Sequence, residues 1–194
     1  MYLQLCPPPQ ARSRILTAAF LFPGPYDPPF NQFVAKVSKN KCCHVELVFE
    51  DEMAFSIFKG SNLFFKPRSF SNPEYQLISL FVTPAEYTAA YSFCKMAHSH
   101  EIGFTDVGMV AAYLQQCPVI NTAPTYEAGY TFCSKVVTEA MQVGGVSEVE
   151  HLVPCMTTPS SLYDALSGSP RKVHHTVPFK CRQLREVGAV FAKR

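Results

Sequence analysis

Apolar side chains in the first half of the chain recur in short runs that predict strands. The run Ile15–Phe22 is continuously apolar and predicts a buried strand, whereas Phe30–Ser38 repeats its apolar residues at helical spacing and predicts a short helix. Four further segments rich in aromatic and β-branched residues follow, separated by turn sequences: His44–Phe49, Met53–Phe58, Asn62–Phe65 and Tyr75–Val82. We expect these four segments to form an antiparallel meander.

Helix start signals dominate the second half of the chain. The sequence Thr83-Pro84-Ala85-Glu86 combines a capping box with proline at the first helical position, which predicts a helix to about His98. Thr158-Pro159 gives a similar signal for a short helix through Leu166. A helix is also expected over 106–116, and two strand-like pieces end the chain at 173–178 and 187–191. With no internal repeat, this order of elements predicts an α+β fold.

One more helix is predicted around a cysteine. Thr131 is a suitable N-cap, apolar residues recur at helical spacing after it, and Gly144-Gly145 supply a stop signal. Cys133 would then lie near the second helical position. Unpaired backbone N–H groups and the positive end of the helix dipole stabilise an anion there, so this position favours a thiolate.

A nucleophilic thiol also needs a base. The best candidate is His44, which begins the predicted strand His44–Phe49. The alternative interpretations are purely structural: Cys133 as a small buried apolar residue, and His44 as a hydrogen-bonded histidine at a strand end.

Composition bounds the class of protein. A chain of 194 residues that is 47% hydrophobic and 16% charged is long enough for one well-buried domain, which we place at 15–194 behind a proline-containing arm at 1–14. The formal charge is only +2, and the 17 Lys and Arg residues are scattered along the chain. This pattern gives no support to nucleic-acid binding.

The eight cysteines show no paired C-x-x-C spacing, which favours reduced thiols and a cytoplasmic location. A weak secretory signal at Ile15–Phe22 is opposed by Pro23-Gly24-Pro25, which ends the run without a cleavage pattern. No segment approaches the length of a membrane span, so membrane association has no support from the sequence. Cys42 and Cys43 stand beside His44, but adjacent strand residues point to opposite faces, and no metal or cofactor is expected.

The order of these features resembles the circularly permuted branch of the NlpC superfamily of papain-like proteins. That branch includes YiiX-type bacterial proteins, a family of poxvirus proteins and, more distantly, enzymes like lecithin:retinol acyltransferase. The likeness spans about Leu21 to Leu166 and rests on histidine preceding cysteine in the chain and on four local sequences: His44-Val45, Phe104-Thr105-Asp106, Thr131–Val137 around Cys133 and the Thr158-Pro159-x-x-Leu162 segment.

The resemblance implies a papain-like domain with an antiparallel sheet packed against helices and the nucleophile helix at the sheet. It implies that Cys133 is the nucleophile and His44 the general base of an acyl transfer that passes through an acyl-enzyme. If the chain is viral, the compartment would be the host cytoplasm.

The third catalytic group stays open between two residues. Relatives often carry a polar residue on the strand after the histidine strand, where this chain offers only Ser56. Glu46 is the rival, because the strand period of two places it on the same face as His44, about 7 Å along the strand.

We therefore expect a cysteine hydrolase, a thiol peptidase or amidase, acting on a peptide or isopeptide. One alternative is a lipid-directed thiol acyltransferase or esterase acting on a lipid ester. The other is a catalytically inactive binding module with the same fold.

Overall fold

The computed structural model describes residues 13–115 and 129–173. Its elements in chain order are β1 (Arg14–Leu21), α1 (Pro29–Val37), β2 (His44–Val48), β3 (Met53–Ser56), β4 (Phe64–Pro67), β5 (Tyr75–Val82), α2 (Pro84–His98), β6 (Gly103–Phe104), α3 (Asp106–Gln115), β7 (Tyr130–Thr131), α4 (Cys133–Val143), the 3-10 helices η1 (Ser147–Val149) and η2 (Pro154–Met156), and α5 (Pro159–Ser167). The described residues thus form a mixed α+β fold, as the sequence predicted.

The main sheet has five antiparallel strands in the order β4-β3-β2-β1-β5. The expected meander is therefore correct for β2, β3 and β4 but wrong for β5, which pairs with β1 instead of β4. The physical reason is the apolar character of β1, which is buried along nearly its whole length and needs a partner on each side. Ala19 accordingly lies opposite Glu46 of β2 and opposite Leu77 of β5.

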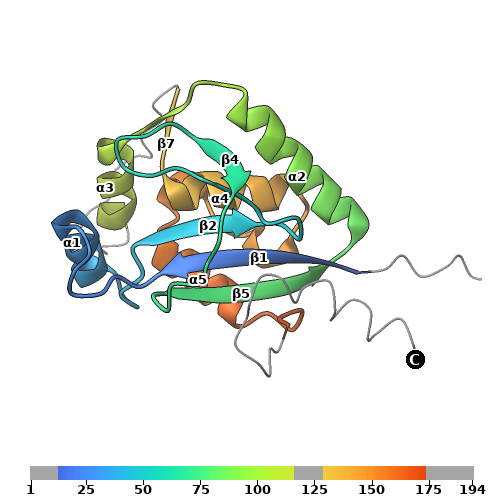
Figure 1. The fold of residues 1–194 in the computed structure, drawn as a ribbon, viewed down its shortest axis with the longest axis horizontal. Coiled ribbons are helices and arrows are strands. Elements are labelled where there is room, and N and C mark those ends of the chain that lie inside the picture. The colour runs from blue at the N-terminus through green and yellow to red at the C-terminus, as the bar shows by residue number, and fades with distance from the viewer. Residues whose placement is uncertain (1–12, 116–128, 174–194) are drawn as a thin grey trace, which may run out of the picture.

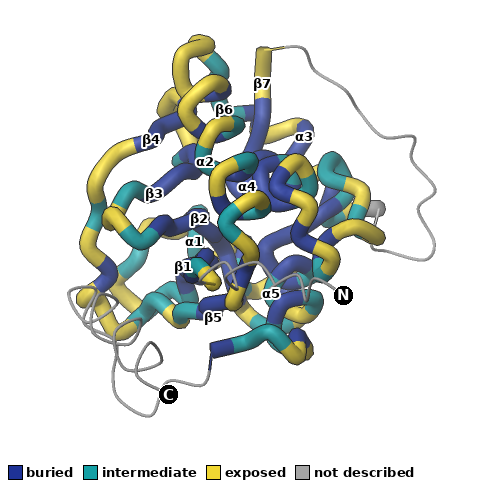
Figure 2. The backbone as a smooth tube through the Cα atoms, turned by 90° about the vertical axis from the view of Figure 1, so that its right-hand side faces the viewer, coloured by how far each residue is buried: buried dark blue, intermediate teal, exposed yellow. Residues whose placement is uncertain are grey.

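The main core lies between one face of this sheet and the helices α2, α4 and α5 (Figure 1). Helix α4 is the central helix, and Figure 2 shows it among the buried parts of the chain. Its end at Gly144 packs closely on α2, since a side chain there would meet the Glu86 carbonyl oxygen at 3.0 Å. Gly145 follows with φ of 80°, a conformation that favours glycine, so the predicted stop signal is confirmed.

A second, smaller apolar cluster lies at one end of the sheet. There α1 and α3, which both lie at this end of the molecule (Figure 1), pack on residues from β1, on the residue before β2 and on the residue before α4. The members of this cluster that matter for the site are Leu21, Cys43 and Phe132. The ends of β2 and α4 that carry His44 and Cys133 therefore meet beside α1 and α3.

The start of α4 differs from the prediction. Thr131 does not cap the helix, because it belongs to β7, which pairs in parallel with β6. Its carbonyl oxygen accepts a hydrogen bond of 2.9 Å from the amide of Thr105. Phe132 is the N-cap, with extended backbone angles, and Cys133 is the first helical residue instead of the second.

The predicted helix starts at Thr83 and Thr158 agree with the structure. Thr83 and Glu86 cap α2 reciprocally, and Thr158 does the same with Ser161 at the start of α5. The expected strand at 173–178 is described only at Val173, whose amide donates to the carbonyl oxygen of Ser79 at 2.7 Å. The expected strand at 187–191 and residues 1–12 of the expected arm lie outside the described residues, and Arg14 already belongs to β1.

Candidate active site

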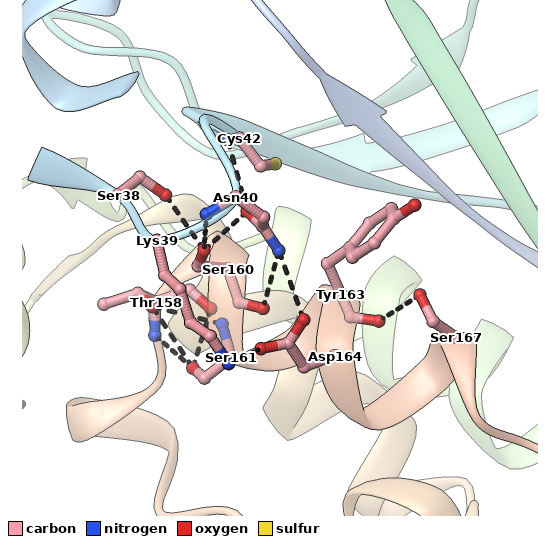
Figure 3. A network of polar contacts seen from close by, with 10 residues as sticks. All are labelled: Ser38, Lys39, Asn40, Cys42, Thr158, Ser160, Ser161, Tyr163, Asp164 and Ser167. Atoms are coloured by element: carbon pink, nitrogen blue, oxygen red, sulfur yellow. Dashed lines mark hydrogen bonds and ion pairs between the residues drawn. The ribbon is translucent and has the colours of Figure 1, made fainter. Parts of the chain in front are cut away.

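His44 is positioned by the loop that leads into β2. Serine and asparagine side chains of this loop, Ser38 and Asn40, bond to Ser160 at the start of α5 (Figure 3). The amide of Cys43 donates to the carbonyl oxygen of Leu21 at 3.0 Å, which starts the pairing of β2 with β1. The loop is thereby fixed at both ends, immediately before the imidazole.

Cys133 is positioned by the strand and the helix that meet at its backbone. The β6–β7 pairing holds the chain up to Thr131, and the helical bonds begin when the Val136 amide donates to the Phe132 carbonyl oxygen at 3.1 Å. Inside the helix, the Ser134 hydroxyl donates to the Thr157 carbonyl oxygen at 2.7 Å and ties α4 to the segment before α5. The N-cap provides no side-chain hydrogen bond to the helix, so this end can hold an anion.

The structure brings Cys133 and His44 together from opposite parts of the chain. Both side chains are buried, at 5% and 7% exposure. Burial alone disfavours an imidazolium, yet the pKa of His44 is raised to about 9, mainly by the charge and hydrogen bonding of Cys133 and then by Glu46. The two residues therefore form an electrostatically coupled pair.

Glu46 lies beside this pair and is completely buried. Its Oε1 atom is 3.7 Å from Nε2 of His44, an ion-pair distance that is too long for a hydrogen bond. Nε2 itself has no hydrogen-bond partner in the described part of the chain. Glu46 thus offers a negative charge beside the imidazole without a hydrogen bond to Nε2.

Ser56 is also buried, but its hydroxyl donates to the carbonyl oxygen of Val45 at 2.7 Å. The contact fastens β3 to β2 and uses the one proton that the hydroxyl can donate. Between the two candidates for the third group, the contacts favour Glu46.

The sequence analysis did not identify three residues that surround this site. Arg68 and Tyr75 bind Glu46, with the Arg68 Nη2 and the Tyr75 hydroxyl each 3.0 Å from Oε1. Phe58 stacks on the His44 ring with 4.5 Å between ring centroids. One signal could have pointed to such a cation without identifying it: a glutamate inside an apolar strand needs a buried cation or proton.

Two further thiols lie near the candidate nucleophile. Burial, followed by the charge of Cys133, raises the pKa of Cys43 to about 12. Burial also raises the pKa of Cys42 above its usual range. Both thiols stay protonated at neutral pH, so neither competes as a nucleophile.

Tyr113 of α3 is a further polar group near this region. Burial raises its pKa above the usual range, and the nearby Cys133 charge acts in the same direction. Within residues 13–115 and 129–173, no group of three His, Cys, Asp or Glu side chains could hold a metal ion. The described helices include none that is long and apolar enough to cross a membrane.

Comparisons with protein-family models, with curated proteins and with solved structures find no match to this chain.

Proposed function

We propose that the protein is a cysteine hydrolase in which Cys133 is the nucleophile, His44 the general acid and base, and Glu46 the group that orients His44. The observation that carries this proposal is the meeting of Cys133, at the first position of α4, with a buried His44 whose pKa is raised by that thiol. A structural cysteine and a structural histidine would not need to be coupled in this way.

The chemistry would proceed through a thioester. The Cys133 thiolate attacks a substrate carbonyl carbon, forming a C–S bond and an oxyanion that backbone N–H groups at the start of α4 can stabilise. The oxyanion collapses, and the leaving group departs with the proton of the His44 imidazolium. Neutral His44 then takes a proton from water, whose oxygen attacks the thioester and releases the acid, Cys133 and His44 in their starting state.

The papain-like architecture of the permuted NlpC type is part of the same proposal. It is supported by histidine preceding cysteine in the chain, and by an antiparallel sheet with the cysteine helix α4 packed on one face. An amide or isopeptide is then the substrate class that we propose.

A lipid ester is the second candidate substrate. One observation favours it: apolar side chains are exposed on α1 and α3, the helices that flank the site. Phe33 and Val107 are 61% and 68% exposed, and Val37 and Val110 are also exposed. Turnover of a long-chain against a short-chain p-nitrophenyl ester, with and without vesicles, separates the two substrate classes.

The proposal is tested by alkylation of each cysteine with iodoacetamide between pH 5 and 9, measured by peptide mass spectrometry. We expect Cys133 to react fast near pH 6.5, well below the ordinary thiol pKa of about 8.5. In His44→Ala the alkylation rate at that pH should fall by about tenfold or more. His98→Ala is the matched control, since His98 is exposed and its ring nitrogen Nδ1 bonds the carbonyl oxygen of Leu63 in a loop.

The internal reference is Cys155, which is partly exposed. If Cys133 reacts no faster than Cys155 and His44→Ala changes nothing, the enzyme proposal fails, and a binding module of the same fold is the interpretation that remains.

A further inference from the structure

The carboxylate beside His44 is itself held by a cation from another part of the chain. Nη2 of Arg68 donates to Oε1 of Glu46 at 3.0 Å, and Nε of Arg68 lies 2.7 Å from Oε2. The guanidinium therefore contacts both oxygens of the carboxylate. Such two-point contact fixes the orientation of a carboxylate as well as compensating its charge.

The position of Arg68 is also fixed. It directly follows β4, where its amide donates to the carbonyl oxygen of Glu52 at 3.0 Å. Its guanidinium carbon lies within 6 Å of three phenylalanine ring centroids, at 5.2 Å from Phe58, 5.8 Å from Phe64 and 5.6 Å from Phe70. Phe58 is the ring that stacks on His44, so one aromatic side chain supports both the base and the cation.

Charged and polar groups from several elements face Glu46 or its neighbour His44. Arg68 faces it from the end of β4, the Tyr75 hydroxyl from β5, and His44 from its own strand, while Cys133 faces His44 from α4. The Tyr75 pKa is raised by burial and by Glu46. The phenol therefore stays protonated, and it donates a hydrogen bond to Oε1. Arg68 is the permanent cation in this group, and it contacts a carboxylate with 0% exposure.

We infer that Arg68 is a positioning residue for the Cys133–His44 pair: it compensates the charge of the buried Glu46 carboxylate and holds it toward His44. This inference rests on the proposed function and extends it, because it adds a fourth residue to the catalytic arrangement. Without Arg68 a fully buried Glu46 would take up a proton, because an uncompensated carboxylate is disfavoured in the interior. A protonated Glu46 would no longer stabilise the imidazolium, and the thiolate would form only at higher pH.

A purely structural role is the competing interpretation. A buried ion pair that only joins β4 to β2 would affect the unfolding free energy and leave the reactivity of Cys133 alone. The pH at which alkylation of Cys133 begins distinguishes the two roles, because stability of the fold does not set it.

The test compares Arg68→Met, Arg68→Lys, Glu46→Gln and the double variant Glu46→Gln/Arg68→Met. We expect Arg68→Met to move the onset of Cys133 alkylation upward by about one pH unit, a roughly tenfold loss of rate near pH 6.5. Arg68→Lys keeps the charge without the two-point contact and should fall between Arg68→Met and the wild type. Urea unfolding of each variant reports stability separately.

The double variant guards against a variant that fails to fold. It leaves no unpaired buried charge, so it should unfold at higher urea than Arg68→Met. The pH at which Cys133 alkylation begins in the double variant should nevertheless match that of Arg68→Met and that of Glu46→Gln. Each of these variants disables the same unit, the Arg68–Glu46 pair.

The outcomes are distinguishable. An onset in Arg68→Met equal to that of the wild type, with a lower unfolding midpoint, overturns the positioning role and leaves the proposed function intact. A wild-type Cys133 that reacts like Cys155 and ignores His44→Ala overturns both.

Discussion

The protonation of His44 results from opposing influences on a single side chain. Burial removes water from the imidazole and disfavours its positive charge, whereas Cys133 and Glu46 offer negative charge on two sides. The net effect of these influences is a His44 pKa of about 9, so the imidazolium is the favoured form below that pH. A buried histidine with only one of these partners would hold its proton less tightly.

The first prediction follows from that balance. Because Cys133 raises the His44 pKa more than Glu46 does, Cys133→Ala should lower the pKa further below about 9 than Glu46→Gln does. Both shifts can be measured by NMR titration of the imidazole C–H resonances, with the other five histidines as internal references. An unchanged His44 pKa in Cys133→Ala would contradict the coupling.

The same shift links stability to pH. The pKa of His44 in the folded protein, about 9, lies above its ordinary value of 6.5. The contribution of protonated His44 to stability is therefore fully present below pH 6.5 and is lost as the pH rises through 9. Cys133→Ala should therefore flatten the fall in unfolding free energy between pH 6.5 and 9.

At the scale of elements, the sequence predicted best where the signal is local. Thr83 and Glu86 lie three residues apart and are sufficient to define the start of α2, because a capping box satisfies amides of its own turn. Thr131 misled the prediction because the pairing of β7 with β6, a contact between distant residues, uses its backbone. Local capping rules contain no information about such pairing.

A second prediction concerns the contact between the loop before β2 and α5 (Figure 3). The Ser160 hydroxyl accepts from the Ser38 hydroxyl at 3.0 Å and from the Asn40 amide at 3.1 Å, and it donates to the Asn40 side-chain oxygen. Ser160→Ala leaves the buried Ser38 hydroxyl and the partly buried Asn40 groups without this partner, which should cost about 1–3 kcal/mol of unfolding free energy.

The same change should also slow alkylation of Cys133, because the loop leads directly to His44. Ser167→Ala is the matched control: its hydroxyl only bonds the Tyr163 carbonyl oxygen within α5. Urea unfolding and the alkylation rate check both effects, and equal behaviour of the two variants would count against a role of the loop contact in positioning His44.

At the scale of the whole molecule, the strand order and the site depend on contacts that the chain pattern leaves open. The meander prediction paired β5 with β4, its neighbour in the sequence, whereas β5 pairs with the distant strand β1. The residues alone made His44 a candidate base, and the family resemblance implied that the fold brings it to Cys133. Arg68 was missed because nothing adjacent to it in the sequence marks it as the partner of Glu46.

The last prediction concerns an ion cluster in which Arg171, near the end of the described residues, contacts α2 and η1. Arg171 pairs with Glu148 of η1 and, at 2.7 Å, with Glu86 of α2. Hydrogen bonding to Arg171 lowers the pKa of Glu148 to about 2, from an ordinary 4.5. This contribution to stability is therefore present above pH 4.5 and is lost as the pH falls toward 2.

Arg171→Met should accordingly lower the unfolding free energy at pH 7 by on the order of 2 kcal/mol, since Glu148 is left largely buried without its cation. Near pH 2 the difference between the variant and the wild type should shrink, because Glu148 is then protonated in the variant and about half protonated in the wild type. Lys39→Met is the control: Lys39 is 81% exposed, and its pair with Asp164 should contribute less than about 1 kcal/mol at either pH. Urea unfolding at both pH values measures the difference. A loss in Arg171→Met that is equal at pH 7 and pH 2 would show that Arg171 stabilises the protein by packing, since a charge effect must fade when its carboxylate is protonated.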